Sequence, residues 1–285
     1  MKPCKSINCF YDPEFRVDVT EQIRRVADGG FLHLDMNFWD WSHDVRSPFM
    51  QDDWREWILR IDDQAKRCGV CFTQAHAHVY NFYDFDRDSV HERQILRSIE
   101  GAGMLRIPWI VLHLSGKQAI DADEEGRKAY FSDNIAYIRD KCEYALRYNV
   151  GIAIENMSNP SRSATTAEDL VQVIDGVQMP NIGACWDTGH AHIAKQDQYT
   201  SLCTLGYRLH ALHIADNHGV TDEHTIPFVG SVDWHSVVKA LREIRYPGDF
   251  TYEAHMFVRN LPEPCKNAGL QLMVRMGEYF CSLAE

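Results

Sequence analysis

The sequence contains no long apolar run and no large cluster of basic residues. No stretch approaches the roughly 18 consecutive apolar residues of a membrane-spanning helix, and residues 1–4 begin no apolar signal region. Lysine and arginine cluster at most in pairs, and the 285 residues carry a formal net charge of −12, so nucleic acid is not an expected partner. Together with an odd number of cysteines, nine, these absences predict a protein of the reduced cytoplasm.

The sequence also lacks the residues and motifs of several classes of enzyme. No lysine stands at the end of a predicted strand, which argues against an aldolase that works through a Schiff base. Neither a P-loop nor a Rossmann fingerprint is present, so nothing predicts a nucleotide cofactor. Cys68 and Cys71 have the spacing of a metal or redox motif, but they lack a second pair and are interpreted as structural.

The sequence does contain eight short, strand-favouring apolar runs separated by helical stretches. The runs cover residues 5–10, 31–36, 70–74, 109–114, 150–154, 182–186, 209–214 and 250–252. Runs such as WIVLHL are apolar almost throughout, which is expected of parallel strands that are covered on both faces. The sheet is therefore predicted to be parallel.

Helical patterns fill the stretches between these runs. The spacing of apolar residues predicts a helix over residues 52–68 that ends at Gly69, Thr165 with Glu168 forms a predicted capping box, and Asp233 is a predicted N-cap. Eight such alternations without a break in composition predict an α/β protein with a single (β/α)8 TIM-barrel domain over residues 1–285.

Carboxylates and imidazoles stand where the last six predicted strands end. In strand order they are His76, His113, Glu155, Asp187, His213 and Glu253. Chemistry in such barrels is placed at this end of the strands, because the loops there vary without disturbing the packed interior. Three carboxylates and the imidazole of His213 at one point suit a divalent ion such as Mn, Mg, Co or Zn, which would also relieve the repulsion between the carboxylates.

Several peptides at these strand ends resemble the xylose isomerase-like barrel superfamily, which includes sugar phosphate isomerases, ketose 3-epimerases and endonuclease IV. The resemblance extends from QAHAH at residues 74–78 to YEAH at residues 252–255, and its most specific parts are AIEN, WDTGH, LHIADN and DEHTIPFVGSVDW. It implies metal ligands at Glu155, Asp187, His213 and Glu253. It further implies that Glu155 and Glu253 transfer protons and that His190 contacts substrate oxygens.

The resemblance leaves two functions open. The isomerases and epimerases imply one metal ion and proton transfer through an enediolate on a sugar or polyol. Endonuclease IV implies three zinc ions and phosphodiester cleavage at abasic sites, and candidates for all nine ligands are present. They are His76, His113, Glu155, Asp187, His190, His213, Asp222, His224 and Glu253.

Loop composition favours the sugar enzyme. The predicted rim loops, such as NFWDWSHD, are acidic and aromatic, whereas an enzyme acting on DNA needs basic residues there. Six aromatic residues are candidates for the walls of a small polyol pocket, namely Trp39, Trp41, Tyr80, Phe82, Trp186 and Phe228. His255, two residues after Glu253, is a further candidate for this pocket.

We therefore predict a metal-dependent sugar or polyol isomerase or epimerase. The alternatives are the zinc endonuclease and a dehydratase acting on a keto-sugar or keto-inositol, because an enediolate can also expel a leaving group. A barrel that serves only as a binding or regulatory module is expected to have lost one or more metal ligands. No predicted ligand is missing from this sequence. Related barrels often associate, so a homodimer is a further expectation.

Overall fold

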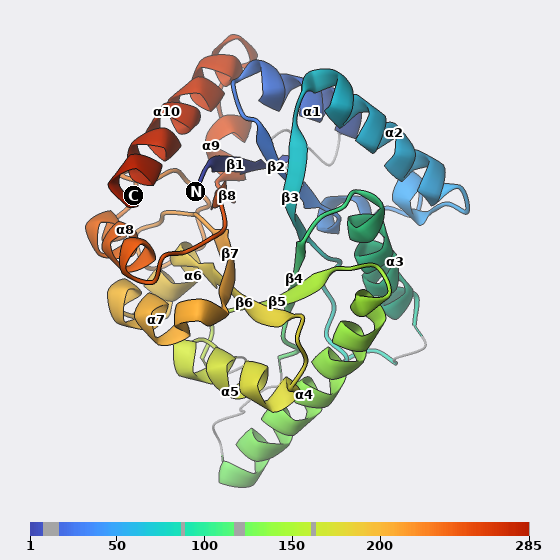
Figure 1. Cartoon of the computed structure of the whole chain (residues 1–285), viewed down its shortest axis with the longest axis vertical. Coiled ribbons are helices and arrows are strands. Elements are labelled where there is room, and N and C mark those ends of the chain that lie inside the picture. Colours follow the sequence, from blue (N-terminus) through green and yellow to red (C-terminus); the bar gives the residue numbers. More distant parts are fainter. Residues whose placement is uncertain (8–16, 87–88, 117–122, 161–163, 285) are drawn as a thin grey trace.

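The computed structural model contains eight parallel strands that form a nearly closed barrel surrounded by helices (Figure 1). It describes residues 1–7, 17–86, 89–116, 123–160 and 164–284. The strands are β1 (Pro3–Ser6), β2 (His33–Asn37), β3 (Cys71–His76), β4 (Trp109–His113), β5 (Gly151–Glu155), β6 (Ile182–Asp187), β7 (Leu209–His213) and β8 (Phe250–Tyr252). The predicted fold class and parallel sheet are thereby confirmed, whereas the extent of the domain stays a prediction.

The first strand differs most from the prediction. It begins at Pro3 and ends at Ser6, and residues 8–10 of the predicted run lie outside the described residues. Lys5 therefore stands one residue before the end of β1, where its buried ammonium donates to the backbone oxygen of Ser6 at 2.7 Å. The last residue of β1 is Ser6 and not Lys5, and the described residues that line the cavity below include no lysine.

Ten α-helices are found among the described residues. They are α1 (Val19–Asp28), α2 (Trp54–Cys68), α3 (Val90–Met104), α4 (Glu124–Leu146), α5 (Ala167–Val177), α6 (Thr188–Ile193), α7 (Gln198–Leu205), α8 (Trp234–Glu243), α9 (His255–Arg259) and α10 (Lys266–Ala284). Gly69 ends α2 in the left-handed conformation, and Asp233 caps α8, both as predicted. The capping box of α5 lies one residue later than predicted, on Thr166 and Asp169.

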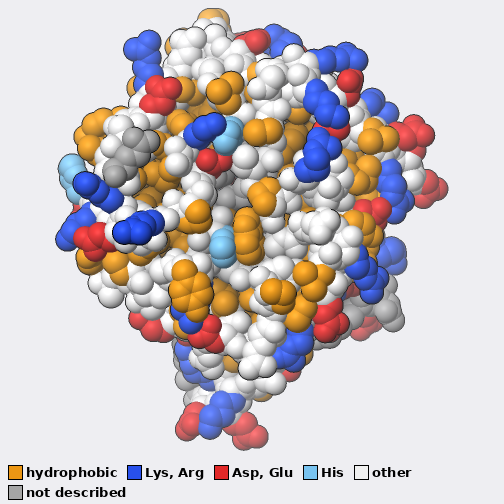
Figure 2. Space-filling model, viewed as in Figure 1, with side chains coloured by type: hydrophobic (Ala, Val, Ile, Leu, Met, Phe, Trp, Pro, Cys, Tyr) orange, Lys and Arg blue, Asp and Glu red, His pale blue; other side chains and the backbone are white. Residues whose placement is uncertain are grey.

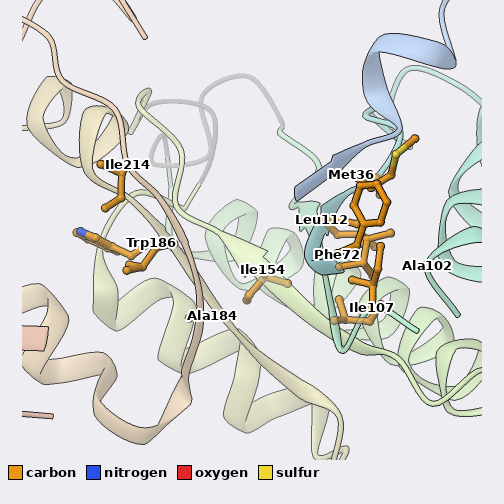
Figure 3. Close-up of a cluster of buried hydrophobic side chains, with 14 of the residues drawn as sticks. Met36, Phe72, Ala102, Ile107, Leu112, Ile154, Ala184, Trp186 and Ile214 are labelled. Atoms are coloured by element: carbon orange, nitrogen blue, oxygen red, sulfur yellow. The ribbon is translucent and has the colours of Figure 1, made fainter. Parts of the chain in front are cut away.

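The main hydrophobic core fills the space between the barrel and its helices (Figure 3). Outward-facing strand residues such as Leu112, Ile154 and Trp186 are almost completely buried there. Trp186 also donates from its indole Nε1 to Gln198 at the start of α7, at 2.9 Å. Burial of these apolar side chains fixes the helices on the outside of the barrel and leaves its interior for the alternate residues of each strand.

A second cluster of small side chains lies inside the barrel. It consists of Val111, Ala153, Cys185 and Ala211, from four successive strands. Side chains two positions apart in a strand point to the same face, so the residues two positions further along also point inward. Those residues are His113, Glu155, Asp187 and His213. The candidate site therefore stands directly on this floor of small side chains.

The barrel ladder is interrupted between β7 and β8. The two strands share one bridge, between Ile214 and Tyr252, while each of the other neighbouring pairs has a longer register. Gln74 of β3 reaches across the barrel to this seam. Its amide donates to the oxygen of Leu212 at 3.2 Å and accepts from the nitrogen of Leu212 at 3.3 Å and from the hydroxyl of Thr251 at 3.4 Å. One buried side chain thus satisfies backbone groups that a neighbouring strand would otherwise pair.

The face at which the strands begin carries a central hollow (Figure 2). Within it, Trp109 stacks on His210 with ring centroids 3.9 Å apart, and His33 lies 2.6 Å from a carboxylate oxygen of Asp249. Basic and acidic side chains are interspersed over this face. No helix among the described residues is long and apolar enough to cross a membrane.

Candidate metal centre and active site

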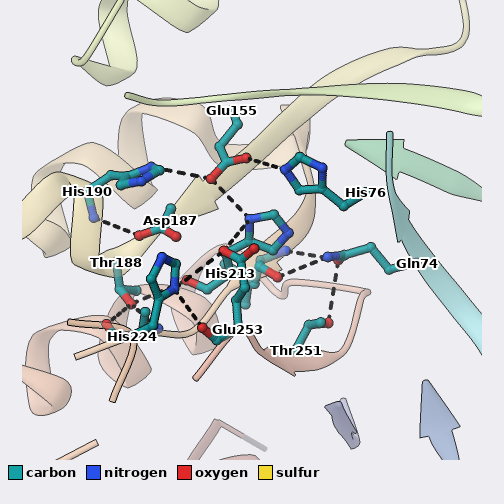
Figure 4. A network of polar contacts seen from close by, with 12 residues as sticks. Gln74, His76, Glu155, Asp187, Thr188, His190, His213, His224, Thr251 and Glu253 are labelled. Carbon is teal, nitrogen blue, oxygen red and sulfur yellow. Dashed lines mark hydrogen bonds and ion pairs between the residues drawn. The ribbon is translucent and has the colours of Figure 1, made fainter. Parts of the chain in front are cut away.

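Four buried side chains converge where β5, β6, β7 and β8 end (Figure 4). Glu155, Asp187, His213 and Glu253 each offer one ligand atom, and these atoms all lie within 4.8 Å of one another. Glu155 and Asp187 are the last residues of their strands, His213 ends β7, and Glu253 follows β8 directly. The structure therefore brings together the four residues that the sequence predicted as a primary metal site.

The charges in this cluster fit a divalent cation. Three carboxylates are almost completely buried beside a single imidazole, and Oδ2 of Asp187 has no hydrogen-bond partner among the described residues. Burial raises the pKa of Asp187 to about 7. An orphaned carboxylate oxygen in a buried acidic cluster is the arrangement that a bound cation would satisfy.

Local sequence explains how Asp187 and His190 are held. Asp187 ends β6 and also caps α6, because its Oδ1 accepts from the backbone N–H of His190 at 2.6 Å. Asn156, the last residue of the AIEN peptide, accepts from the backbone nitrogen of Asp187 at 2.7 Å. Its backbone oxygen lies 2.9 Å from Nδ1 of His190. The AIEN and WDTGH peptides therefore position each other across two neighbouring strands.

Glu155 is the centre of the polar network. Its Oε1 lies 3.0 Å from Nδ1 of His213 and 3.3 Å from Nδ1 of His190, while its Oε2 lies 3.0 Å from Nε2 of His113. Burial alone would raise the pKa of Glu155, but the charges of His213 and His113 hold that pKa well below its ordinary value. Glu155 is therefore an ionised carboxylate able to accept a proton or a cation.

Two further groups of ligand-type residues adjoin this cluster. Nε2 of His76 lies 3.1 Å from Nε2 of His113 and 3.5 Å from Oε2 of Glu155. On the other side, Oδ2 of Asp222 lies 3.2 Å from Nε2 of His190 and 2.9 Å from Nε2 of His224. All nine residues that the sequence singled out therefore lie in one connected region.

A cavity of about 370 Å³ opens above the cluster. Glu155 and Glu253 reach its wall, whereas Asp187 and His213 are not among the described residues that line it. His255 also lines it, as the sequence suggested. Sequence reasoning did not find Asp40 and Arg259, which lie in irregular or short segments where no periodicity indicates orientation.

The aromatic wall was largely a wrong prediction. Of the six aromatic candidates, Trp39 alone is among the described residues that line the cavity. Trp41 and Trp186 belong to the hydrophobic core, and Phe228 lies outside the barrel, stacked on Phe280 of α10. Trp186 precedes the inward-facing Asp187 in the same strand, so strand alternation turns it toward the helices.

A buried carboxylate fixes the loop that carries Asp222 and His224. Asp216 is fully buried and accepts four N–H groups from its own loop segment. The donors are the backbone nitrogens of Asn217, Phe228 and Val232 and the indole nitrogen of Trp234, at 2.8–3.0 Å. In the LHIADN peptide the histidine, His213, is the predicted ligand, and the structure shows that the aspartate, Asp216, anchors the adjoining loop.

We expect Asp216→Asn to lower the free energy of unfolding by about 3–5 kcal/mol, because an amide cannot accept all four buried donors and opposes some of them with its own N–H groups. Urea unfolding of both proteins measures the change. Asp175→Asn is the matched control, since Asp175 is half-exposed in an ion pair with Arg208 and should cost less than about 1 kcal/mol. Equal costs in the two variants would contradict the anchoring role.

Comparisons with known proteins agree with this fold. A family model described as xylose isomerase-like TIM barrel matches residues 23–269, and the chain belongs to this family. An uncharacterised protein of Sinorhizobium fredii is 26% identical over 253 residues, which cover 81% of this chain and 79% of that protein.

Two other relatives have descriptions that name a reaction. An L-ribulose 3-epimerase of Methylomonas sp. is 25% identical over 161 residues, which cover 56% of this chain and 52% of the relative. The crystal structure of a D-tagatose 3-epimerase-like protein superposes with a TM-score of 0.78 at 19% identity, covering 100% of this chain and 98% of that chain. At this identity the structural likeness shows the fold alone.

Proposed function

We propose that the chain is a divalent-metal-dependent isomerase or epimerase of a sugar or polyol, with Glu155 and Glu253 as its proton-transferring residues. One observation carries the proposal. Of the four clustered ligand-type residues, the two glutamates are the ones that also line the cavity, so they can both hold an ion and touch a substrate. The description of the relative from Methylomonas sp. as an L-ribulose 3-epimerase supports the same reaction class.

The four clustered residues would have separate tasks. Asp187 and His213 lie below the cavity wall and would hold the ion together with the two glutamates. A divalent cation there would polarise a substrate carbonyl and its neighbouring hydroxyl, which acidifies the adjacent C–H and stabilises an enediolate.

Both glutamates have the protonation state that a base needs. Without an ion, burial acts to raise the pKa of Glu253, but the charges of His213 and His224 hold it below the ordinary value, as His213 and His113 do for Glu155. With an ion bound, the cation would supply this charge, because His213 must be neutral to be a ligand. One carboxylate removes the proton next to the carbonyl. In an epimerase the other returns a proton to the opposite face of the same carbon, and in an isomerase the proton returns to the neighbouring carbon.

Exchange of substrate protons with solvent tests this proposal. Protein loaded with Mn, Co or Zn is incubated in deuterated water with a panel of ketoses, and the products are analysed by mass spectrometry and NMR. We expect one deuterium at a carbon next to the carbonyl, and the labelled carbon distinguishes 3-epimerisation from aldose–ketose isomerisation. Absence of label from every ketose, with the metal bound, would argue against proton transfer on sugars.

A zinc endonuclease is the second candidate, because the two outer groups of residues have the composition of further metal sites. His76 and His113 face one oxygen of Glu155, and His190 and His224 face one oxygen of Asp222. Cleavage of a duplex oligonucleotide with a single abasic site tests this function directly. The described cavity lining, with one arginine and no lysine, offers little cationic surface for a phosphate backbone, which favours the sugar enzyme.

A further inference from the structure

Arg259 is the one lysine or arginine among the described residues that line the cavity. It is the last residue of the short helix α9, which begins two residues after Glu253. Its side chain is partly buried and makes no hydrogen bond or ion pair with any described residue. A cationic residue thus lines the same cavity as Glu155 and Glu253, and it has no partner among the described residues.

No acidic residue in the described part of the chain provides that partner. Asp222, which lines the same cavity, is engaged by His190 and His224. Other partly buried arginines have acceptors within the chain. Arg127 pairs with a carboxylate oxygen of Asp169 at 2.6 Å, and Arg139 donates to the backbone oxygens of Gly176 and Val177. Partial removal of a guanidinium from water is unfavourable unless an acceptor replaces the lost hydration, so an unmatched one in a cavity indicates an acceptor supplied by the ligand.

The chemistry of the guanidinium defines that acceptor. Its planar fork of donors matches the paired oxygens of a phosphate or a carboxylate, and such charge-assisted pairs are stronger than those with neutral hydroxyls. Arg259 also follows the eighth strand, a region of these barrels in which phosphate groups are often bound. Its position and its chemistry therefore indicate the same class of ligand.

We propose that Arg259 is a specificity-determining residue that binds an anionic group of the substrate, either a phosphate ester or a carboxylate, and so selects acidic sugars over neutral ones. The proposal rests on the sugar-directed function proposed above, and it adds the class of substrate. It concerns binding alone, so it can be measured without turnover.

Three open-chain six-carbon probes test it: D-glucitol, D-gluconate and D-glucitol 6-phosphate. The three probes share a polyol skeleton. D-glucitol is uncharged, D-gluconate carries a carboxylate, and D-glucitol 6-phosphate carries a phosphate. Calorimetric titration of the metal-loaded protein gives their dissociation constants for the wild type, Arg259→Gln and Arg259→Lys. Arg60→Gln, on the exposed face of α2, is the matched control for loss of a positive charge.

We expect at least one acidic probe to bind about ten- to a hundred-fold more tightly than D-glucitol to the wild type and to Arg60→Gln. In Arg259→Gln this preference should fall to about two-fold or less, and Arg259→Lys should retain part of it. Preference for the phosphate identifies a sugar phosphate, and preference for the carboxylate identifies a sugar acid.

Two outcomes overturn the proposal: equal binding of all three probes to the wild type, or a preference that survives in Arg259→Gln. Circular dichroism of each variant confirms that the fold is intact. Loss of deuterium exchange with ketoses, with the Arg259-dependent preference kept, would reject the proposed reaction and leave the anion site standing, so failure of one proposal is distinguishable from failure of the other.

Discussion

Glu155→Gln and Glu253→Gln are each expected to lower the rate of substrate proton exchange by a factor of about 1,000 or more. Each substitution removes a proton acceptor from the cavity wall, and loss of a general base alone typically costs about 100- to 10,000-fold. Each also replaces a charged ligand atom of the cluster with an amide, which weakens any bound ion. Deuterium incorporation under saturating metal measures the loss.

Glu143→Gln is the control for this pair. Glu143 is an exposed residue of α4, and it is not among the described residues that line the cavity. It should exchange protons at the wild-type rate. The proton-transfer assignment fails if either cavity variant, folded and loaded with metal, keeps more than about a tenth of the wild-type rate. A measurement of metal content in each variant separates loss of the base from loss of the ion.

Removal of divalent metal is expected to stop proton exchange and to lower the melting temperature by about 5 °C. The cluster buries three carboxylates whose ligand atoms lie within 4.8 Å of one another, so the repulsion between these carboxylates increases when the cation leaves. An ion at about 100 times its dissociation constant contributes about 2.7 kcal/mol, which corresponds to a shift of this size in a chain of 285 residues. Calorimetry before and after dialysis against a chelator gives the shift.

Asp187→Asn is the control for this experiment, since the chelator should change its melting temperature far less than that of the wild type. Elemental analysis of the same samples also separates the two candidate enzymes. About one ion per chain supports the isomerase or epimerase, and three zinc ions support the nuclease. An unchanged melting temperature together with full activity after complete removal of metal would falsify the metal-dependent function.

The sequence predicted the barrel because parallel strands covered on both faces leave an unmistakable pattern of apolar runs. It also predicted which residues would meet, since the ends of such strands share one rim. The structure accordingly brings Glu155, Asp187, His213 and Glu253 within one cluster, while their roles stay predictions.

The rest of the site depends on features that periodicity does not encode. Arg259 lines the cavity from a five-residue helix that follows β8, and no apolar pattern marks so short an element. The anchoring by Asp216 depends on long-range donors such as Trp234, 18 residues away in sequence. The position of Trp186, by contrast, follows from strand alternation and was within reach of sequence reasoning.

The interruption of the ladder between β7 and β8 bears on how an ion enters and leaves. His213 ends one of these strands and Glu253 follows the other, so an ion held by both would cross-link the two sides of the seam. The single bridge and the amide of Gln74 would then open only together with those coordination bonds. Release of the ion would then require local unfolding of the barrel wall, and exchange of the metal would be slow even though the cavity above the cluster is open to solvent.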